Sequence, residues 1–197
     1  MFTGIVEHVG RLEQLRAIDG GVSLRIDLGP LCADLALGDS VAVDGICLTA
    51  TAIEPPFADF DASTESLRRT TLGEWRPGRP LNLERAMAVG ARFGGHILGG
   101  HVDGVGRLER RLRSGNSEEF HFLLPSDGSV TVVEKGSVAI DGVSLTTWDC
   151  RGLRFKVAVI PHSLARTTLA AARPGTRVNL EQDVVGRWVE RLLAERG

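Results

Sequence analysis

The sequence has few cysteines and lacks long runs of basic or apolar residues. Its three cysteines, Cys32, Cys47 and Cys150, are odd in number and lack CxxC spacing, which argues against a disulfide framework or a zinc knuckle. A net charge of -2 without a basic run argues against nucleic acid as a partner and favours a small molecule. No apolar run approaches the roughly 18 residues of a membrane span, and no cationic region precedes an apolar one at the N-terminus. We therefore expect a soluble, cytoplasmic protein with no membrane partner.

The chain contains an internal repeat. SVAVDGICLT at 40–49 returns as SVAIDGVSLT at 137–146, with seven of ten positions identical. Three more blocks return in the same order: VGRLE at 9–13 and 105–109, SLRRTTL at 66–72 and SLARTTL at 163–169, and PGRPLNLE at 77–84 and PGTRVNLE at 174–181. The offset stays at 96 or 97 residues. This tandem duplication predicts two similar domains, 1–96 and 97–183, followed by a tail at 184–197.

Each half is predicted to be mostly β-strand. Short segments rich in Val, Ile, Leu and Phe alternate with Gly or Pro punctuation, at 22–28, 40–45, 48–53, 120–124, 131–135, 137–142 and 155–160. We expect about six strands per half, each about four to seven residues long. An open sheet of such short strands would leave its edges exposed, whereas a closed sheet would not. We therefore predict an all-β fold class, with two tandem six-stranded Greek-key closed barrels. A short helix beginning at the serine of SLRRTTL is expected between strands.

The tail QDVVGRWVERLLAERG is predicted to form a C-terminal α-helix. Asp183 is suited to cap it. Its apolar residues recur at intervals of three and four and form one face: Val185, Trp188, Val189, Leu192 and Leu193. An apolar stripe that includes a tryptophan is costly to leave in water. The helix therefore either docks on its own barrels or packs against copies of itself, and we favour self-association as an oligomerisation helix.

Two groups of polar residues suggest a binding surface. Cys47 and Thr49 alternate after the first turn of the repeat, as do Ser144 and Thr146 after the second, so each pair lies on one strand face. For any one of these residues, packing or a backbone hydrogen bond is the alternative role.

The segment GGHILGGH at 94–101 joins the two halves. Its histidines, His96 and His101, are five residues apart, whereas a metal pair on a helix needs three or four, so no metal site is predicted. The glycines allow close approach of the backbone to a flat ligand. Neither GxxxxGK[ST] nor a strand-associated GxGxxG is present, which argues against nucleotide-phosphate binding.

Eight segments together resemble one family. MFTGIVE, DGICLT, ESLRRTTLG, NLERA, GGHILGGHVDGVG, GNS, EKGSVAIDGVSLT and IPHSLARTTL, in this order and spacing, are similar to riboflavin synthase, a family of trimeric enzymes built from two lumazine-binding barrels. The resemblance covers essentially the whole chain. It implies a transferase for the last step of riboflavin biosynthesis, in which one 6,7-dimethyl-8-ribityllumazine gives a four-carbon unit to another. The products are riboflavin and 5-amino-6-(D-ribitylamino)uracil, and no cofactor is consumed. A homotrimer is implied, and association with lumazine synthase is left open.

The resemblance also implies the substrate-binding residues, at an interface between the first barrel of one subunit and the second barrel of a neighbour. For the first barrel it implies Gly4, Ile5, Val6, Cys47, Leu48, Thr49, Asp61, Ala62, Ser63, Thr64, Glu65 and Ser66. For the second barrel it implies Gly100, His101, Val102, Lys135, Ser144, Leu145, Thr146, Ile160, Pro161, His162, Ser163, Leu164 and Ala165.

The halves differ where a donor and an acceptor would have to differ. Cys47 corresponds to Ser144, Glu65 corresponds to His162, and Lys135 has no lysine counterpart. Phe2 and Thr3 correspond only to Leu98 and Gly99. These positions are the candidates for chemistry, and the sequence does not assign donor and acceptor to particular barrels.

The predicted catalytic residues are His101, Ser144, Cys47, Phe2 and Thr3. His101 would exchange a proton with the ring methyl or an adduct, since the reference pKa of histidine lies near 6.5; a satisfied turn histidine is the alternative. Ser144 and Cys47 would steady or generate a nucleophilic adduct. Phe2 and Thr3 would close the pocket against solvent.

Three rival functions follow from the same pattern. A lumazine-binding protein of the same fold would hold the ligand without converting it, but both halves keep their SLT-like and TTL blocks. A flavin-reductase barrel would need a dinucleotide domain for which this chain is too short. A purely structural trimer would not need polar strand faces.

Overall fold

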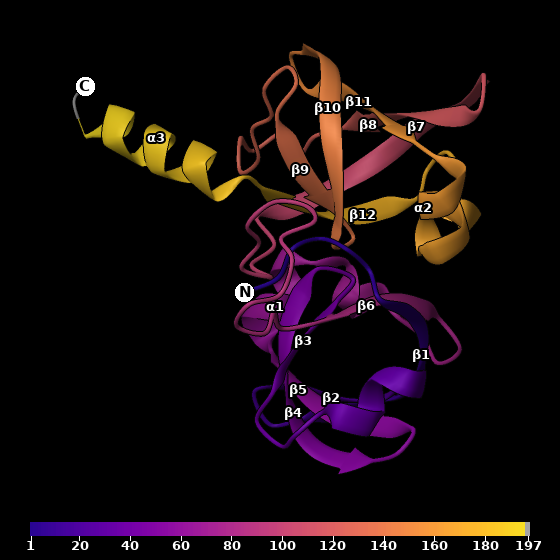
Figure 1. Ribbon diagram of the computed structural model, residues 1–197. Helices are drawn as coiled ribbons and strands as arrows, with labels where there is room; N and C mark the ends of the chain where they lie inside the picture. Colours follow the sequence, from indigo (N-terminus) through magenta and orange to yellow (C-terminus); the bar gives the residue numbers. More distant parts are fainter. Residues whose placement is uncertain (196–197) are drawn as a thin grey trace.

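The structure, a computed structural model, describes residues 1–195 and contains two closed antiparallel barrels (Figure 1). The first barrel consists of β1 (His8–Ile18), β2 (Gly21–Asp27), β3 (Ser40–Val43), β4 (Ile46–Glu54), β5 (Phe57–Ser63) and β6 (Pro80–Arg85). The second consists of β7 (Gly104–Ser114), β8 (Ser117–Leu123), β9 (Ser137–Ile140), β10 (Val143–Arg151), β11 (Arg154–Val159) and β12 (Arg177–Gln182). Both close in the same order, β1-β2-β5-β4-β3-β6 and β7-β8-β11-β10-β9-β12. The predicted pair of six-stranded barrels is confirmed.

Short helices precede the last strand of each barrel, and one more lies between β2 and β3. The first barrel carries η1 (Gly29–Asp34), α1 (Thr64–Arg69) and η2 (Thr71–Glu74), and the second carries α2 (Pro161–Arg166) and η3 (Thr168–Ala171). The predicted start of α1 at Ser66 is wrong, because the helix begins at Thr64. Ser63 caps it by accepting a hydrogen bond from the Ser66 amide at 3.2 Å.

Two details of the strand prediction are also wrong. β1 and β7 are 11 residues long, and β4 and β10 are 9, because each bends around its barrel through an irregular register. The segment 131–135 is not a strand. The amide of Thr131 donates a hydrogen bond to the side chain of Gln182 at 2.9 Å. Lys135 has a positive φ of 60°, so the chain turns there and does not pair as a strand.

In each barrel, every second side chain along a strand points inward, and these side chains form the core of that barrel. In β2, Leu24 and Ile26 are fully buried, while the residues between them face outward. The second barrel packs Phe120, Phe122 and Phe155 together at its centre. Burying one such side chain contributes about 1.5–3 kcal/mol. Each repeat therefore builds a core of its own.

The tail forms α3 (Val184–Ala194), capped by Asp183, which accepts a hydrogen bond from the Val185 amide at 2.9 Å. Arg187 pairs with Asp103 at 2.8 Å, and Glu190 accepts from Gln182, so the helix meets its barrel through polar side chains. The predicted apolar stripe is exposed, and Figure 1 shows the helix projecting away from both barrels. The predicted helix ran to 197, and residues 196–197 lie outside the described residues. Within 1–195, no helix is long and apolar enough to cross a membrane.

Two asparagines join the barrels reciprocally. The Asn82 side chain donates to the carbonyl of Asp141 at 2.9 Å and accepts from the amide of Thr168 at 2.8 Å. In the equivalent arrangement, the Asn179 side chain donates to the carbonyl of Asp44 at 2.8 Å and accepts from the amide of Thr71 at 2.8 Å. Each side chain thus satisfies one carbonyl and one amide of the other barrel, which fixes how the barrels pack.

Two glutamates hold the segments that cross between the barrels. Glu84 of β6 accepts hydrogen bonds from the amides of Thr3 and Gly4 at 2.6 and 2.9 Å. Glu181, its equivalent on β12, accepts from the amides of Gly99 and Gly100 at 2.8 and 3.0 Å. Desolvation raises the pKa of both carboxyls, and for Glu181 to about 7.

We predict that Asn82→Ala lowers the free energy of unfolding by roughly 2–4 kcal/mol, because it leaves the Asp141 carbonyl and the Thr168 amide without their partner. Denaturant-induced unfolding measures the change. Asn179→Ala should behave alike, whereas Asn116→Ala, in the exposed β7–β8 turn, should stay within about 0.5 kcal/mol of the wild type. Equal effects at 82 and 116 would contradict the bridging role.

We predict that Glu181 makes the protein less stable as pH rises. Its pKa is raised in the folded state, so the folded chain keeps a proton that the unfolded chain releases. The resulting stabilisation is fully present below about pH 4.5 and is lost as pH rises through about 7, a change of about 3 kcal/mol at most. Glu181→Gln should lack this dependence, so the difference between the wild-type and variant unfolding free energies should change with pH by this amount.

The matched control is Glu109→Gln, because Arg154 lowers the pKa of Glu109 and gives it the opposite sign. The stabilisation that Glu109 contributes to the folded state is present above the pKa of the unfolded chain and is lost as pH falls. A pH-independent difference between the wild type and Glu181→Gln would refute the raised pKa.

Candidate functional site

The predicted substrate-binding residues of the first barrel lie where two strands stop pairing. β4 and β5 are paired from Glu54↔Phe57 up to Ala50↔Phe60, and within residues 1–195 the two strands do not pair beyond that point. Residues 46–49 of β4 continue with β3, and residues 61–63 of β5 continue with β2. The facing edges of 47–49 and 61–63 thus present backbone donors and acceptors that the ladder between β4 and β5 does not use. Such edges can bind the polar rim of a flat ligand.

The second barrel repeats this arrangement. β10 and β11 pair from Arg151↔Arg154 to Thr147↔Val157 and then separate. Residues 143–146 of β10 continue with β9, and β11 continues with β8 as far as Val159. The predicted segments 144–146 and 160–165 therefore flank the second separation. We call residues 47–49 and 61–66 the core of the first site, and 144–146 and 160–165 the core of the second site.

The side chains of both sites follow the expected alternation. Leu48 and Leu145 are buried and point into their barrels. Cys47 and Ser144 are half-buried, while the threonines that follow the two leucines are exposed. The prediction that each polar pair lies on one strand face is confirmed by this burial pattern. A ligand between the separated strands would meet one sulfur or hydroxyl and one threonine from each site.

Each site is completed by a segment from the other half of the chain. The amide of Cys47 donates to the carbonyl of Gly100, and the amide of Ser144 donates to the carbonyl of Gly4, both at 2.8 Å. Val102 packs on the core of the first barrel, and Val6 packs on the core of the second. The predicted grouping of 4–6 with Cys47 and of 100–102 with Ser144 is therefore wrong: the two segments are exchanged. Glu84 and Glu181 each hold the crossing segment of their own half, and the carbonyls of Gly4 and Gly100 then reach the other barrel.

The exchange requires glycine at both crossing points. Gly4 and Gly100 have positive φ values of 79° and 73°. A Cβ on Gly4 would lie 2.5 Å from the Cβ of Ser144, and a Cβ on Gly100 would lie 2.6 Å from that of Cys47. Both distances are shorter than real carbon contacts. These glycines let the backbone run directly against the candidate residues.

Phe2 and Thr3 lie in the contact between the barrels. Phe2 is 1% exposed, forms an antiparallel bridge with Leu98, and packs in a small cluster against Ala42 and Ala139 that also touches Cys47. The Thr3 hydroxyl donates to Glu84 at 2.7 Å. The predicted closure of a substrate pocket by these two residues stays a prediction. They hold the N-terminal segment in place.

The remaining predicted residues give the two sites different charges. In α1, hydrogen bonds from Arg69 and Arg68 lower the pKa of Glu65. The equivalent position in α2 is the exposed His162. Lys135 is exposed, and its amide donates to the carbonyl of Thr147 at 2.9 Å.

His101 is exposed, next to the buried Gly100. The other predicted members flank the two strand separations. They are Asp61 to Ser63 on β5, Thr64 and Ser66 on α1, and Ile160 with Pro161 and Ser163 to Ala165 at α2.

Sequence reasoning missed one residue that touches the second site. The Nδ1 of His96 lies 2.7 Å from the Oγ of Ser144, and its imidazole is 8% exposed. Desolvation lowers the pKa of His96, and the charge of Asp183 opposes this shift. His96 was weighed only as half of a metal pair, and the spacing of GGHILGGH contains no signal for contact with Ser144. The two anchoring glutamates were also missed, although the NLE block that contains them occurs in both halves.

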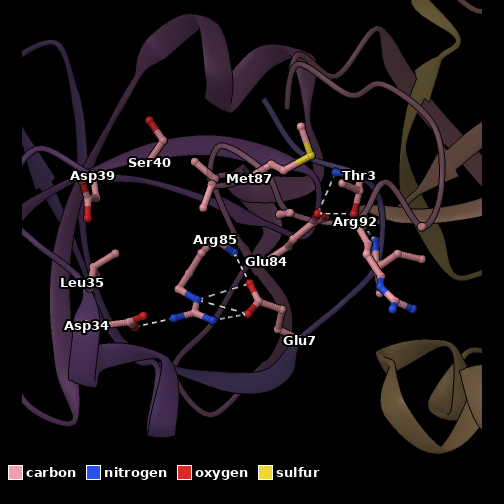
Figure 2. A pocket seen from close by; sticks show the side chains of 15 residues that line it. Thr3, Glu7, Asp34, Leu35, Asp39, Ser40, Glu84, Arg85, Met87 and Arg92 are labelled. Atoms are coloured by element: carbon pink, nitrogen blue, oxygen red, sulfur yellow. Dashed lines mark hydrogen bonds and ion pairs between the residues drawn. The ribbon is translucent and has the colours of Figure 1, made fainter.

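A cavity of about 600 Å³ lies elsewhere, on the first barrel beside the N-terminal segment. Figure 2 shows Arg85 in its floor between Glu7 and Asp34, with Glu84 bonded to Thr3 at its edge. The charges at the floor satisfy one another. Residues 47–49 and 144–146 do not line this cavity, although the predicted residues Thr3 and Ile5 do, so it borders the N-terminal segment and lies apart from the cores of both sites.

Comparisons with known proteins agree with this duplicated arrangement. The family model described as lumazine binding domain matches residues 3–86 and 99–183. Riboflavin synthase of Mycobacterium tuberculosis is 44% identical over 202 residues and covers all of both chains. That of Actinobacillus pleuropneumoniae is 40% identical over 196 residues, covering 100% of this chain and 91% of the relative.

A solved structure shares the fold. Crystalline LumP complexed with 6,7-dimethyl-8-(1'-D-ribityl) lumazine superposes with a TM-score of 0.84 at 22% sequence identity, covering 92% of this chain and 99% of LumP. Matches to the domain model in both halves, together with full-length relatives at this level of identity, show that the chain belongs to the riboflavin synthase family.

Proposed function

We propose that the protein is a riboflavin synthase that converts two molecules of 6,7-dimethyl-8-ribityllumazine into riboflavin and 5-amino-6-(D-ribitylamino)uracil by transfer of a four-carbon unit. The observation that carries this proposal is the presence of two equivalent strand separations in one chain, each next to a different reactive side chain, Cys47 or Ser144. Two copies of one substrate need two similar sites. A donor and an acceptor need sites that are not identical.

Alignment of the two rings is the main catalytic contribution in this proposal. Holding two reactants in register removes the entropic cost of their encounter, which supplies roughly 7–11 kcal/mol in well-aligned systems. The backbone edges at 47–49 and 144–146 would bind the pyrimidinedione edges, and the threonines and crossing segments would hold the ribityl chains. We propose 1–96 and 97–183 as the two lumazine-binding units.

Catalytic roles then fall to side chains near the rings. Ser144 and Cys47 would steady an adduct, and His101 would exchange protons with the substrate. Phe2 and Thr3 would act by holding the N-terminal segment, whose Gly4 contacts Ser144. The predicted set of binding residues stays as stated, with the two crossing segments exchanged.

We further propose that the protein acts as a homotrimer. Threonines and helix residues of both sites are exposed in one chain, so a neighbouring barrel is needed to enclose the substrates. The stripe on α3 offers the contact: Val185 is 64% exposed and Trp188 is 65% exposed. Exposed apolar surface of this kind favours association. A cytoplasmic location stays a prediction from the sequence pattern, and association with lumazine synthase stays open.

The function is tested by mixing the purified protein with 6,7-dimethyl-8-ribityllumazine alone. We expect riboflavin and 5-amino-6-(D-ribitylamino)uracil to form in equal amounts. Absorbance and chromatography measure the two products. Titration with riboflavin should saturate at two equivalents per chain. Binding without conversion would identify a lumazine-binding protein instead, and a single equivalent per chain would refute the two-site proposal.

The trimer is tested with the double variant Trp188→Glu and Leu192→Glu. Charges on the stripe should yield monomers in sedimentation, with thermal unfolding little changed because both residues are exposed. Conversion should fall by roughly 10²-fold or more, since the rings lose their alignment. Ala194→Glu is the control, because it adds a glutamate half a turn away from the stripe and should leave the trimer intact. A fully active monomer would rule out shared sites.

A further inference from the structure

His96 distinguishes the second site from the first. Its Nδ1 lies 2.7 Å from the Oγ of Ser144, within hydrogen-bonding distance. Cys47 occupies the equivalent position in the first barrel, and no side-chain hydrogen bond to its thiol occurs within residues 1–195. Of two positions that the repeat makes equivalent, only Ser144 is hydrogen-bonded to an imidazole in the described part of the chain.

The backbone places His96 with little freedom. Its amide donates to the carbonyl of Thr3 at 3.1 Å. The preceding residue, Gly95, is so tightly enclosed that a Cβ there would lie 2.1 Å from the Thr3 oxygen and 2.9 Å from the Ser144 Cβ. Because Glu84 fixes Thr3, the imidazole is tied to the same anchor as the crossing segment. Ser144 and His96 are thus positioned by a single network.

The other ring nitrogen of His96 has no partner. Nε2 is buried and unpaired, one of four such side-chain atoms among the residues that the structure describes. Buried polar atoms are usually satisfied, so an unpaired one beside a binding residue points to a group that arrives with the ligand. His96 is itself 8% exposed, so bulk water does not reach it freely.

We propose that His96 is a positioning residue for the second site, which acts through Ser144. The neutral imidazole accepts the Ser144 O–H at Nδ1 and turns the lone pairs of Oγ toward the ligand. Nε2–H is then the donor left for the substrate or for a water that it carries. This inference rests on the proposed function and adds that the second barrel, through this pair, treats its substrate differently from the first.

The proposal has a defined pH dependence. Desolvation lowers the pKa of His96, and the charged group that opposes this is Asp183, at the start of α3. The imidazole is therefore neutral at pH 7 and above. As pH falls below the ordinary histidine range, protonation of Nδ1 removes the acceptor for Ser144, and the rate decreases.

The test is a double-mutant cycle of His96→Leu and Ser144→Ala in the full-length protein, with riboflavin formation as the readout. His96→Leu should lower kcat by roughly 10- to 100-fold with KM little changed. In the Ser144→Ala background the same substitution should have a much smaller effect, since the hydroxyl that the imidazole orients is absent and only the Nε2–H donor is lost. His121→Gln is the control: it replaces a histidine of β8 that pairs with Glu119, and it should be as active as the wild type.

A second variant separates positioning from folding. His96→Asn keeps an acceptor near the place of Nδ1 but does not titrate, so it should recover part of the activity and lack the decrease of kcat at acid pH. Equal losses for His96→Leu with Ser144 present and absent, or an unchanged acid limb in His96→Asn, would overturn the proposal while leaving the function intact. A wild type without turnover would overturn both.

Discussion

The structure depends on the reciprocal contact between its two barrels. Asn82 and Asn179 each bond a carbonyl and an amide of the other barrel, and Glu84 and Glu181 each hold the segment that crosses over. Buried polar groups of this kind are costly unless every partner is present, so the arrangement admits one way of packing the barrels. The positions of Gly4 and Gly100, and hence of both sites, follow from it.

Duplication supplies two sites, and small departures from symmetry make them different. Arg79 pairs with Asp44 at 3.0 Å, whereas Asp141, the equivalent carboxyl, has Thr176 in place of that arginine. Burial and the neighbouring charge of Asp44 raise the pKa of Asp141 well above its usual value. Together with the histidine beside Ser144, this gives the second barrel a different electrostatic environment. A reaction between two identical molecules requires such a difference.

The sites combine rigid and open parts. Their backbone edges belong to barrel strands, which keep a flat ligand in register, but α1, α2 and the threonines face solvent in a single chain. The apolar stripe of α3 lies on the side of the helix away from Arg187 and Glu190, which contact the barrel. A chain built in this way has complete folding cores and incomplete sites. Association would enclose the substrates without changing either barrel.

The sequence determined the duplication, the strand content and the capped tail helix. These features are local or periodic, and a repeat with an offset of 96 or 97 residues is visible without coordinates. The residues that flank each strand separation came from the family resemblance. Tertiary structure decided the exchange of the crossing segments, the anchoring role of Glu84 and Glu181, and the contact of His96 with Ser144. Such contacts join residues 48 to 140 positions apart, and no spacing rule records which half of a duplicated chain a segment will cross to. Only the packing of the barrels settles that choice.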